Sequence, residues 1–305
     1  MLTYFLRRAA RAVLTLIGIS IVVFVIARLS GDPSLQLAPE DATPAELAQI
    51  RAELGLDKPI PVQYLVFVER VAHGEFGNSI RYQQPALPLV LSVLPATLQL
   101  GLSAFVLSTV AGVLLGVVTA LKRGSWMDSA TRGLAVIGQA APSFWIGMML
   151  ILLFSVQLHW LPSSGRLGLE HMMLPTLALA LNSVAVVLRL TRASMLETLS
   201  SDYVRFLRAK GVPRRLIVWK HALRNSSIPV VAVLGVQLGH LIGGAVIVET
   251  VFNWPGVGRL MVEALNARDF AVIQAGALLV SFFTVGANLS VDLLFGVIDP
   301  RIRYE

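Results

Sequence analysis

Six long apolar blocks, separated by mostly short polar segments, constrain the fold of this chain more than any other feature. Each block has 18 to 26 residues, enough for an α-helix to cross about 30 Å of hydrocarbon. Charged residues make up only 14% of the chain, against about a quarter in soluble domains. We therefore expect an all-α polytopic membrane protein with six transmembrane helices. The expected spans are Ala12–Leu29, Ala96–Leu121, Leu134–Val156, Leu174–Leu196, Val230–Val248 and Val272–Val297. Pro142 is expected to bend or break the third of them.

The first block follows Arg7, Arg8 and Arg11, as the apolar core of a signal peptide would. It is longer than a usual signal core, and no A-x-A cleavage site follows it. We interpret residues 1–29 as an N-terminal cytoplasmic segment and a retained first span.

Residues 30–94 form the one sizeable polar insert. Thr43, Pro44 and Glu46 fit a capping box with proline at the first helical position, and Gly55 is a plausible stop. A second short helix is expected from about Pro61 to His73. We predict a small extracytoplasmic helical insert lying on the outer membrane surface, with no catalytic constellation. The permease core is then residues 95–297, and 298–305 form a cytoplasmic tail.

The positive charges indicate the orientation of the spans. Of the 25 Lys and Arg residues, 17 lie on the side of the N-terminus: three before the first span, three after the second, nine around the fourth loop and two at the end. The positive-inside rule therefore places both termini in the cytoplasm of a multi-pass protein of a bacterial inner membrane. The net charge of +7 is then explained by membrane topology. We expect contact with membrane lipid and no nucleic-acid partner.

Few polar groups interrupt the spans. Of these, His240 lies deep, and Asp292 lies near the inner end of the last span. Ion-coupled transporters usually carry ionisable groups at mid-membrane, so an ion-gradient-driven secondary transporter is the weaker alternative. No HExxH motif or Ser/His/Asp arrangement suggests an enzyme, and the absence of cysteine excludes a Cys-based metal site. We expect no metal and no catalytic residue.

Small residues recur at four-residue spacing in two spans, where they allow close helix approach. They are Gly112 and Gly116 in the second span, and Gly235, Gly239 and Gly243 in the fifth. Packing within this subunit and packing against a second subunit along a pathway both fit the pattern. The candidate residues for the pathway or for helix packing are Gln237, Gly239, His240 and Gly243.

The stretch from Ser200 to Pro229 is the longest basic run, with seven Lys and Arg against a single acid, Asp202. Asp202 is expected to cap a helix from Tyr203 to Lys210 that Gly211 ends. Pro213 would start a second helix through Leu223, and Asn225-Ser226-Ser227 would begin the next one. Apolar Val204, Leu207, Leu216, Ile217 and Trp219 are expected to anchor the pair and leave the tip at Ala209-Lys210-Gly211 exposed. An amphipathic pair lying on anionic lipid is the alternative.

This stretch and several further motifs resemble the permease subunits of bacterial ATP-binding-cassette importers. The match is to the B-type subunit of the dipeptide/oligopeptide (peptide/nickel/haem) branch, with the type I importer fold. It covers nearly the whole chain. The motifs are Asp202-Tyr203-Val204-Arg205, Arg208-Ala209-Lys210-Gly211, His221-Ala222-Leu223-Arg224-Asn225, Gly74-Glu75-Phe76-Gly77-Asn78-Ser79, Leu94-Pro95-Ala96-Thr97, Ala141-Pro142-Ser143-Phe144, the run from Glu249 to Gly258, and Asp299-Pro300-Arg301. The chain departs from the general permease motif at Arg205, Phe206 and Leu207, where Glu-Ala-Ala is usual.

The resemblance implies a translocating subunit that carries di- or oligopeptides, or else nickel chelates, glutathione or haem. Its implied partners are a homologous second permease, two ATP-binding subunits and an extracytoplasmic peptide-binding protein. ATP and Mg would be bound by those partners, because no G-x-x-x-x-G-K-[ST] phosphate loop occurs in this sequence. The implied ATPase-coupling residues are Asp202, Tyr203, Arg205, Arg208, Ala209, Lys210 and Gly211. A loop with an exposed Trp254 is the candidate outer gate or binding-protein contact, comprising Phe252, Asn253, Trp254, Pro255 and Gly256.

Overall fold

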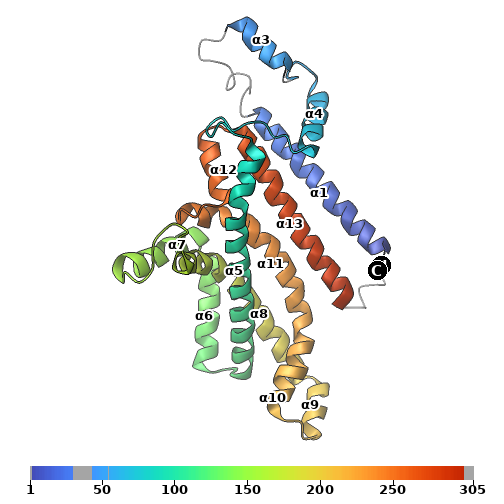
Figure 1. The fold of residues 1–305 in the computed structure, drawn as a ribbon. Coiled ribbons are helices and arrows are strands. Elements are labelled where there is room, and N and C mark those ends of the chain that lie inside the picture. The colour runs from blue at the N-terminus through green and yellow to red at the C-terminus, as the bar shows by residue number, and fades with distance from the viewer. Residues whose placement is uncertain (1, 30–42, 54, 299–305) are drawn as a thin grey trace.

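The computed structural model describes residues 2–29, 43–53 and 55–298. Every regular element in these ranges is a helix, apart from one isolated bridge between Asn78 and Pro85. The prediction of an all-α membrane fold is confirmed. The elements form an elongated bundle with a small helical insert at one end and a helical hairpin at the other (Figure 1).

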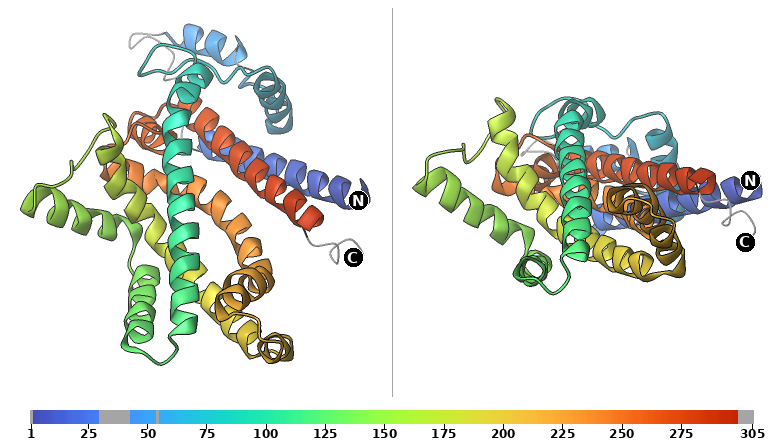
Figure 2. Two further views of the ribbon diagram at one scale, coloured as in Figure 1. Left: turned by 60° about the horizontal axis from the view of Figure 1, so that its bottom comes forward. Right: turned by 90° about the horizontal axis from the view of Figure 1, so that it is seen from below.

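Five helices are long and apolar enough to cross a membrane, and one bent pair supplies a sixth candidate span. Four of the candidates lie in α1 (Leu2–Leu29), α5 (Ala86–Leu121), α8 (Leu169–Ser200) and α13 (Phe270–Ile298). The other runs from Arg214 to Val251 and contains α11 (Leu223–Val251). The pair consists of α6 (Trp126–Ala140) and α7 (Ser143–Leu150), the latter extended by the π-helix η1 (Ile151–Gln157). The start of α1 and the end of α13 lie at the same end of the molecule (Figure 2).

The third span bends by 112° where α6 meets α7, as Pro142 predicted. Ala141 is extended (φ −80°, ψ 130°), the conformation that a following proline favours. Pro142 then precedes the first residue of α7. As a result α7 and η1 leave the bundle as an arm (Figure 2), and no residue of η1 is buried.

Two prolines that directly precede expected spans lie inside helices. Pro95 is within α5, which begins ten residues before the predicted start, and Pro229 is within α11. The predicted new start at Asn225-Ser226-Ser227 is wrong, because the serine hydroxyls bond back to the preceding turn: Ser226 Oγ donates to the Leu223 carbonyl (3.1 Å) and Ser227 Oγ to that of Arg224 (2.8 Å). Such bonds satisfy the hydroxyls without a break. A helical rod therefore runs from Arg214 to Val251 without interruption.

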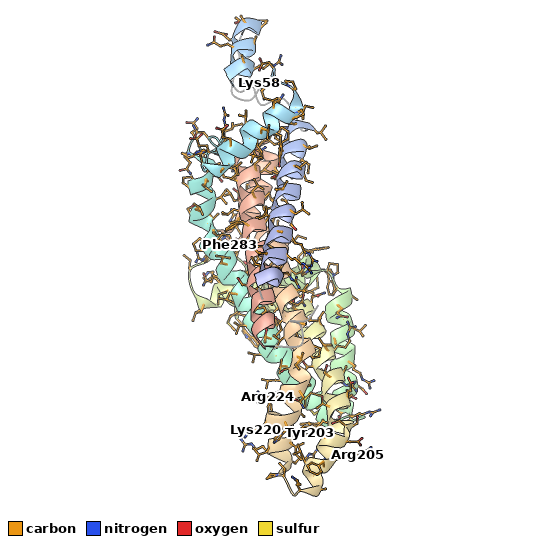
Figure 3. The ribbon with its side chains drawn as sticks, turned by 90° about the vertical axis from the view of Figure 1, so that its right-hand side faces the viewer. Lys58, Tyr203, Arg205, Lys220, Arg224 and Phe283 are labelled. Carbon is orange, nitrogen blue, oxygen red and sulfur yellow. The ribbon has the colours of Figure 1, made fainter. Side chains whose placement is uncertain are left out.

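The core lies between α5, α8 and α11, around Leu100, Leu174 and Leu241. A β-carbon on Gly112 would lie 2.6 Å from Val187 Cβ, and one on Gly116 would lie 2.6 Å from Thr191 Cβ. This glycine pair therefore allows α5 and α8 to approach within one subunit, which decides between the two readings left open for it. Helix α1 instead packs on the periphery against α13 (Figures 1 and 3).

The insert contains α3 (Pro44–Glu53) and α4 (Ile60–Ala72). Its predicted capping box is present: Glu46 N–H donates to Thr43 Oγ1 (3.3 Å), and Thr43 N–H donates to Glu46 Oε2 (2.7 Å). Gly55 has a φ of +66°, as the predicted helix stop requires. Ser79 Oγ donates to the buried Asp269 (2.5 Å), which fastens the insert to the residues just before α13.

Candidate functional site

The hairpin and the outer loop, two of the sites singled out by sequence, lie at opposite ends of the bundle. The hairpin, residues 202–222, comprises α9 (Asp202–Ala209), α10 (Arg214–Leu216) and the π-helix η2 (Ile217–Ala222). The outer loop, residues 252–256, joins α11 to α12 (Val257–Asn266) at the far end. Figure 1 shows α9 and α10 at one end of the bundle and α12 at the other.

Gly211 forms the turn of the hairpin with a φ of +75°. Val212 N–H donates to the Leu207 carbonyl (3.1 Å) and Gly211 N–H to the Arg208 carbonyl (3.0 Å). This pair of bonds is a Schellman motif, which places its left-handed residue where Gly211 lies. A β-carbon there would meet no atom within 4 Å. Glycine is therefore required for backbone conformation, and the space around it is open.

The cap of α9 differs from the prediction by one residue. Ser201 is the N-cap, with extended backbone (φ −68°, ψ 154°), and Asp202 is the first helical residue. Asp202 accepts a hydrogen bond from Arg205 Nη1 (3.1 Å) within the first turn. A carboxylate at this position still interacts favourably with the helix dipole.

The hairpin is anchored by fewer apolar residues than predicted. Val204, Ile217 and Val218 are buried, and Val218 joins Val117 and Met195 in a cluster with the ends of α5 and α8. Leu216 and Trp219 are instead 47% exposed each, so their predicted anchoring role is wrong. They are three residues apart and share a helix face, and burial of Ile217 and Val218 turns that face outward.

The exposed surface of the hairpin combines aromatic, apolar and basic side chains. Tyr203, Phe206, Leu216 and Trp219 are exposed among the arginines and lysines of the basic run. Figure 3 shows Tyr203, Arg205, Lys220 and Arg224 at this end of the molecule. Aromatic residues and arginine are enriched in protein–protein interfaces, so this surface is suited to docking another protein.

Two contacts stiffen the hairpin. The Tyr203 hydroxyl lies 2.9 Å from His221 Nδ1 and joins its two arms. Lys210 Nζ lies 4.5 Å from the centre of the Phe206 ring, within the range of a cation–π contact. All seven residues predicted to couple to an ATPase are on this hairpin and exposed, namely Asp202, Tyr203, Arg205, Arg208, Ala209, Lys210 and Gly211.

In the outer loop, the prediction of an exposed Trp254 is wrong. Trp254 and Phe252 are fully buried, and the indole Nε1–H of Trp254 donates to the Ala96 carbonyl of α5 (2.9 Å). A tryptophan that finds a partner for its N–H contributes its large apolar area to the core. Asn253 and Pro255 remain exposed, while Gly256 is buried.

Glu249, which sequence reasoning did not single out, holds the outer loop together. Its buried carboxylate accepts hydrogen bonds from Thr97 Oγ1 (2.6 Å) and from Arg259 N–H (3.1 Å) at the start of α12. Thr97 Oγ1 in turn accepts from Val257 N–H (2.8 Å). A carboxylate at a helix N-terminus pairs with otherwise free N–H groups and with the helix dipole. The signal in the sequence was Glu249 followed by Gly256 and Gly258, whose missing side chains leave room for it.

A polar chain continues from the outer loop to the insert. Arg259 donates to the Asn253 carbonyl (3.0 Å) and to Glu263 Oε1 (2.9 Å), and the Tyr82 hydroxyl donates to Glu263 Oε2 (2.9 Å). The pKa of Tyr82 is raised, mainly by partial burial and secondly by the hydrogen bond to Glu263. The hydrogen bonds of Arg259, Glu263 and Tyr82 connect the insert, α12 and the outer loop into one surface at this end of the bundle.

A second buried acid also escaped the sequence reasoning. Asp128, 1% exposed, accepts hydrogen bonds from Arg192 Nε (2.7 Å) and Nη2 (2.9 Å) in a bidentate pair. This pair fixes the start of α6 to α8. Asp128 also accepts from Gly124 N–H (3.1 Å) in the preceding turn.

The candidate pathway residues on α11 do not converge. Gln237 and Gly239 are buried, and a β-carbon on Gly239 would lie 2.6 Å from Asn288 Oδ1 of α13. His240 and Gly243 are exposed. Gly239 is therefore explained by packing within the subunit, whereas His240 and Gly243 face away from it. No group of three or more His, Cys, Asp or Glu residues suited to a metal occurs in the described part of the chain.

Comparison with known proteins identifies two matching families. Residues 112–304 match the family described as "Binding-protein-dependent transport system inner membrane component". Residues 1–101 match the corresponding N-terminal family, described as "Binding-prot-dependent transport system membrane comp, N-term".

Full-length relatives and solved structures agree with these matches. The chain is 41% identical to the dipeptide transport system permease protein DppB of Escherichia coli K12 and 40% identical to the glutathione transport system permease protein GsiC of Salmonella choleraesuis, with 100% of each chain covered. The inward-facing MetNI methionine ABC transporter shares the fold, with a TM-score of 0.57 and 17% identity over 69% of this chain and 96% of that one. An amino acid ABC transporter with histidines has a TM-score of 0.52 and 16% identity over 70% of this chain and 94% of that one.

Proposed function

This chain belongs to the family of binding-protein-dependent transport system inner membrane components, and we propose that it is the translocating subunit of an ATP-driven importer of dipeptides or closely related small peptides. Glutathione is such a peptide, and both cargo classes follow the names of relatives that match over the full length of this chain. The chain itself carries no phosphate loop, so it is not the ATPase.

The observation that carries this proposal is the hairpin. It projects from one end of the bundle with exposed aromatic and basic side chains, and the rod from Arg214 to Val251 connects it to the far end. The chain has no phosphate loop of its own, and this surface is suited to dock the separate subunit that hydrolyses ATP. Closure of the motor would tilt the rod and alternate access to the pathway.

We further propose the composition of the assembly. Two ATP-binding subunits, holding ATP and Mg, dock on the hairpin of this chain and on that of a homologous second permease. The exposed stripe of α11, with Val236, His240, Gly243 and Ile247 at helical spacing, faces that second permease or the pathway between the two.

The excess of Lys and Arg around the hairpin supports its placement in the cytoplasm. Both termini then lie on the same, cytoplasmic side of a bacterial inner membrane. The outer loop and the insert face an extracytoplasmic peptide-binding protein, which Asn253 and Pro255 can contact because they are exposed.

The test is ATPase coupling in the reconstituted assembly. Gly211→Val forces a β-branched residue to a φ of +75°, which costs about 1–3 kcal/mol, and we expect loss of peptide-stimulated ATP hydrolysis. Gly211→Asn should retain most of it, since asparagine tolerates this conformation. Gly124→Val is the matched control, because Gly124 also has a positive φ (+79°) and open space around it.

Two outcomes would refute the proposal. One is equal loss of coupling in both valine variants, since the effect would then be general strain. The other is peptide uptake that persists without ATP but follows an ion gradient, which would identify a secondary transporter.

A further inference from the structure

Two neighbouring cavities open between α1, α4 and α13, on the side of the bundle where α4 crosses the ends of the other two helices (Figure 3). The first, the polar cavity, has a volume of 350 Å³ and is lined in part by Arg28, Arg70, Glu75, Gln63 and Asn78. The second, the apolar groove, has a volume of 460 Å³. Phe67 and Phe76 line both, so the two cavities are contiguous.

The apolar groove offers almost nothing to a polar ligand. Its lining includes Leu16, Ile17, Val71, Leu279 and Phe282, and the hydroxyls of Ser20 and Tyr64 are its two polar side-chain groups. These hydroxyls lie 2.7 Å apart, and Ser20 Oγ donates to the Ile17 carbonyl (2.8 Å), so they satisfy one another. A peptide backbone in this groove would leave its own polar groups unpaired at a cost of several kcal/mol each, whereas a hydrocarbon chain would not.

The polar cavity has the opposite character. Its charged side chains are two arginines and one glutamate. The side chains of Arg70 and Glu75 are exposed, and neither has a hydrogen-bond or ion-pair partner within the ranges that the structure describes. Arginine suits a phosphate, and a carboxylate suits an ammonium group. The charges therefore complement a zwitterionic headgroup better than a free anion.

The heights of the two cavities match one leaflet of a bilayer. Arg28 lies one residue before the end of α1, and Ile17 lies eleven residues earlier, about 16 Å along the helix axis. Half of the hydrocarbon core is about 15 Å thick. Helix α4 contains no buried residue, and its Ile60 and Leu65 are 67% and 66% exposed, as in a helix lying at a membrane surface.

We propose that these two cavities bind one phospholipid with an ethanolamine headgroup. Its phosphate lies at Arg28 and Arg70, its ammonium at Glu75, and one acyl chain fills the groove between α1, α4 and α13. The bound lipid links the peripheral α1 to the insert and to α13. Assignment to the outer leaflet rests on the proposed orientation, but lipid binding itself is measured independently of transport.

The test is lipid retention by the full-length protein after nanodisc reconstitution with equal amounts of phosphatidylethanolamine, phosphatidylglycerol and phosphatidylcholine. Native mass spectrometry after mild detergent release should show one retained phospholipid per chain, enriched in phosphatidylethanolamine. Arg70→Ala should lower its occupancy about tenfold, because a charge-assisted bond is lost. Lys58→Ala, which removes a charge just before α4 without touching either cavity, should not.

Two further variants separate the acyl chain from the headgroup. Ala72→Phe fills the apolar groove and should displace the lipid, whereas Leu65→Phe adds a ring on α4 outside both cavities and should retain it. Glu75→Gln should abolish the preference for phosphatidylethanolamine over phosphatidylglycerol while keeping a lipid bound.

Several results would overturn the proposal. They are unchanged retention in Arg70→Ala and Ala72→Phe, equal retention of the three lipids by the unmodified protein, and displacement of the lipid by inorganic phosphate, which would indicate a simple anion site. Displacement by a dipeptide would indicate a peptide site instead. If the unmodified protein retains the lipid but the assembly does not transport peptides, the proposed function fails and the lipid proposal stands.

Discussion

Replacement of Gly256 by alanine should loosen the outer end of the molecule through Glu249. A β-carbon at Gly256 would lie 2.3 Å from Glu249 Cδ and from Glu249 Oε1, and 2.5 Å from Oε2. The three nearest atoms all belong to this one side chain. That side chain cannot move freely, because Thr97 Oγ1 and Arg259 N–H hold its oxygens at 2.6 and 3.1 Å.

The expected cost follows from these contacts. Overpacking costs about 1–3 kcal/mol, and weakening one hydrogen bond to a buried charge costs about 1.5–3 kcal/mol. We expect Gly256→Ala to lower the free energy of unfolding by about 3 kcal/mol. Gly243→Ala should have an effect near zero or stabilise by up to about 1 kcal/mol, because Gly243 lies within α11 with no atom near its missing β-carbon.

The assay is equilibrium unfolding in mixed micelles, followed by tryptophan fluorescence, with a double-mutant cycle. Glu249→Ala removes all three clashing atoms, so adding Gly256→Ala to it should cost less than about 1 kcal/mol. The resulting coupling energy is about 2 kcal/mol, well above the departure expected for independent sites. Additive effects of the two substitutions would refute the idea that the glycine makes room for the carboxylate.

Three further outcomes are expected. Lys210→Glu should impair peptide-stimulated ATP hydrolysis by reversing a charge at the hairpin tip, while reporter fusions show unchanged topology; unimpaired hydrolysis would exclude this side chain from the docking surface. Gly112→Ala should destabilise the protein by about 1–3 kcal/mol in the same unfolding assay, because its β-carbon would lie 2.6 Å from Val187 Cβ, and Gly133→Ala, with open space around it, should not. Arg192→Leu should also lower the free energy of unfolding, because it removes the bidentate partner of the Asp128 carboxylate and leaves it only Arg132 Nε at 3.7 Å and the Gly124 N–H; unchanged stability would contradict this account of the pair.

The sequence was sufficient where one local rule decides the outcome. Span length and hydropathy predicted the order of the apolar segments, of which five are candidate spans and a bent pair supplies a sixth. Pro142 predicted the bend in that pair, and Gly211 predicted the hairpin turn. The capping box at Thr43 likewise formed as expected. In each case a few consecutive residues determine the backbone, so no knowledge of distant contacts is needed.

The sequence was insufficient where tertiary contacts decide. The loop around Trp254 has turn-forming residues and looks exposed, but a carbonyl of α5 pairs with its indole and the core covers the ring. Glu249 looks like an ordinary acid at the end of a span until Thr97 and the start of α12 close around it. Pro229 directly precedes an expected span, yet α11 continues through it, and the Ser226 and Ser227 hydroxyls bond to carbonyls of the preceding turn.

The unbroken rod from Arg214 to Val251 fixes the distance between the hairpin and the outer loop and also their relative rotation about the helix axis. Its 38 residues span about 57 Å at the rise of an α-helix, from Arg214 within the hairpin to Val251 beside the outer loop. Adding or deleting one residue anywhere along it would rotate the hairpin by about 100° relative to the outer loop and turn its exposed face away from any docked subunit. Insertions and deletions between these two ends should therefore be far less tolerated than point substitutions. The segment sets both the distance and the relative rotation of the hairpin and the outer loop. Chimaeras between related permeases should therefore exchange it as one piece.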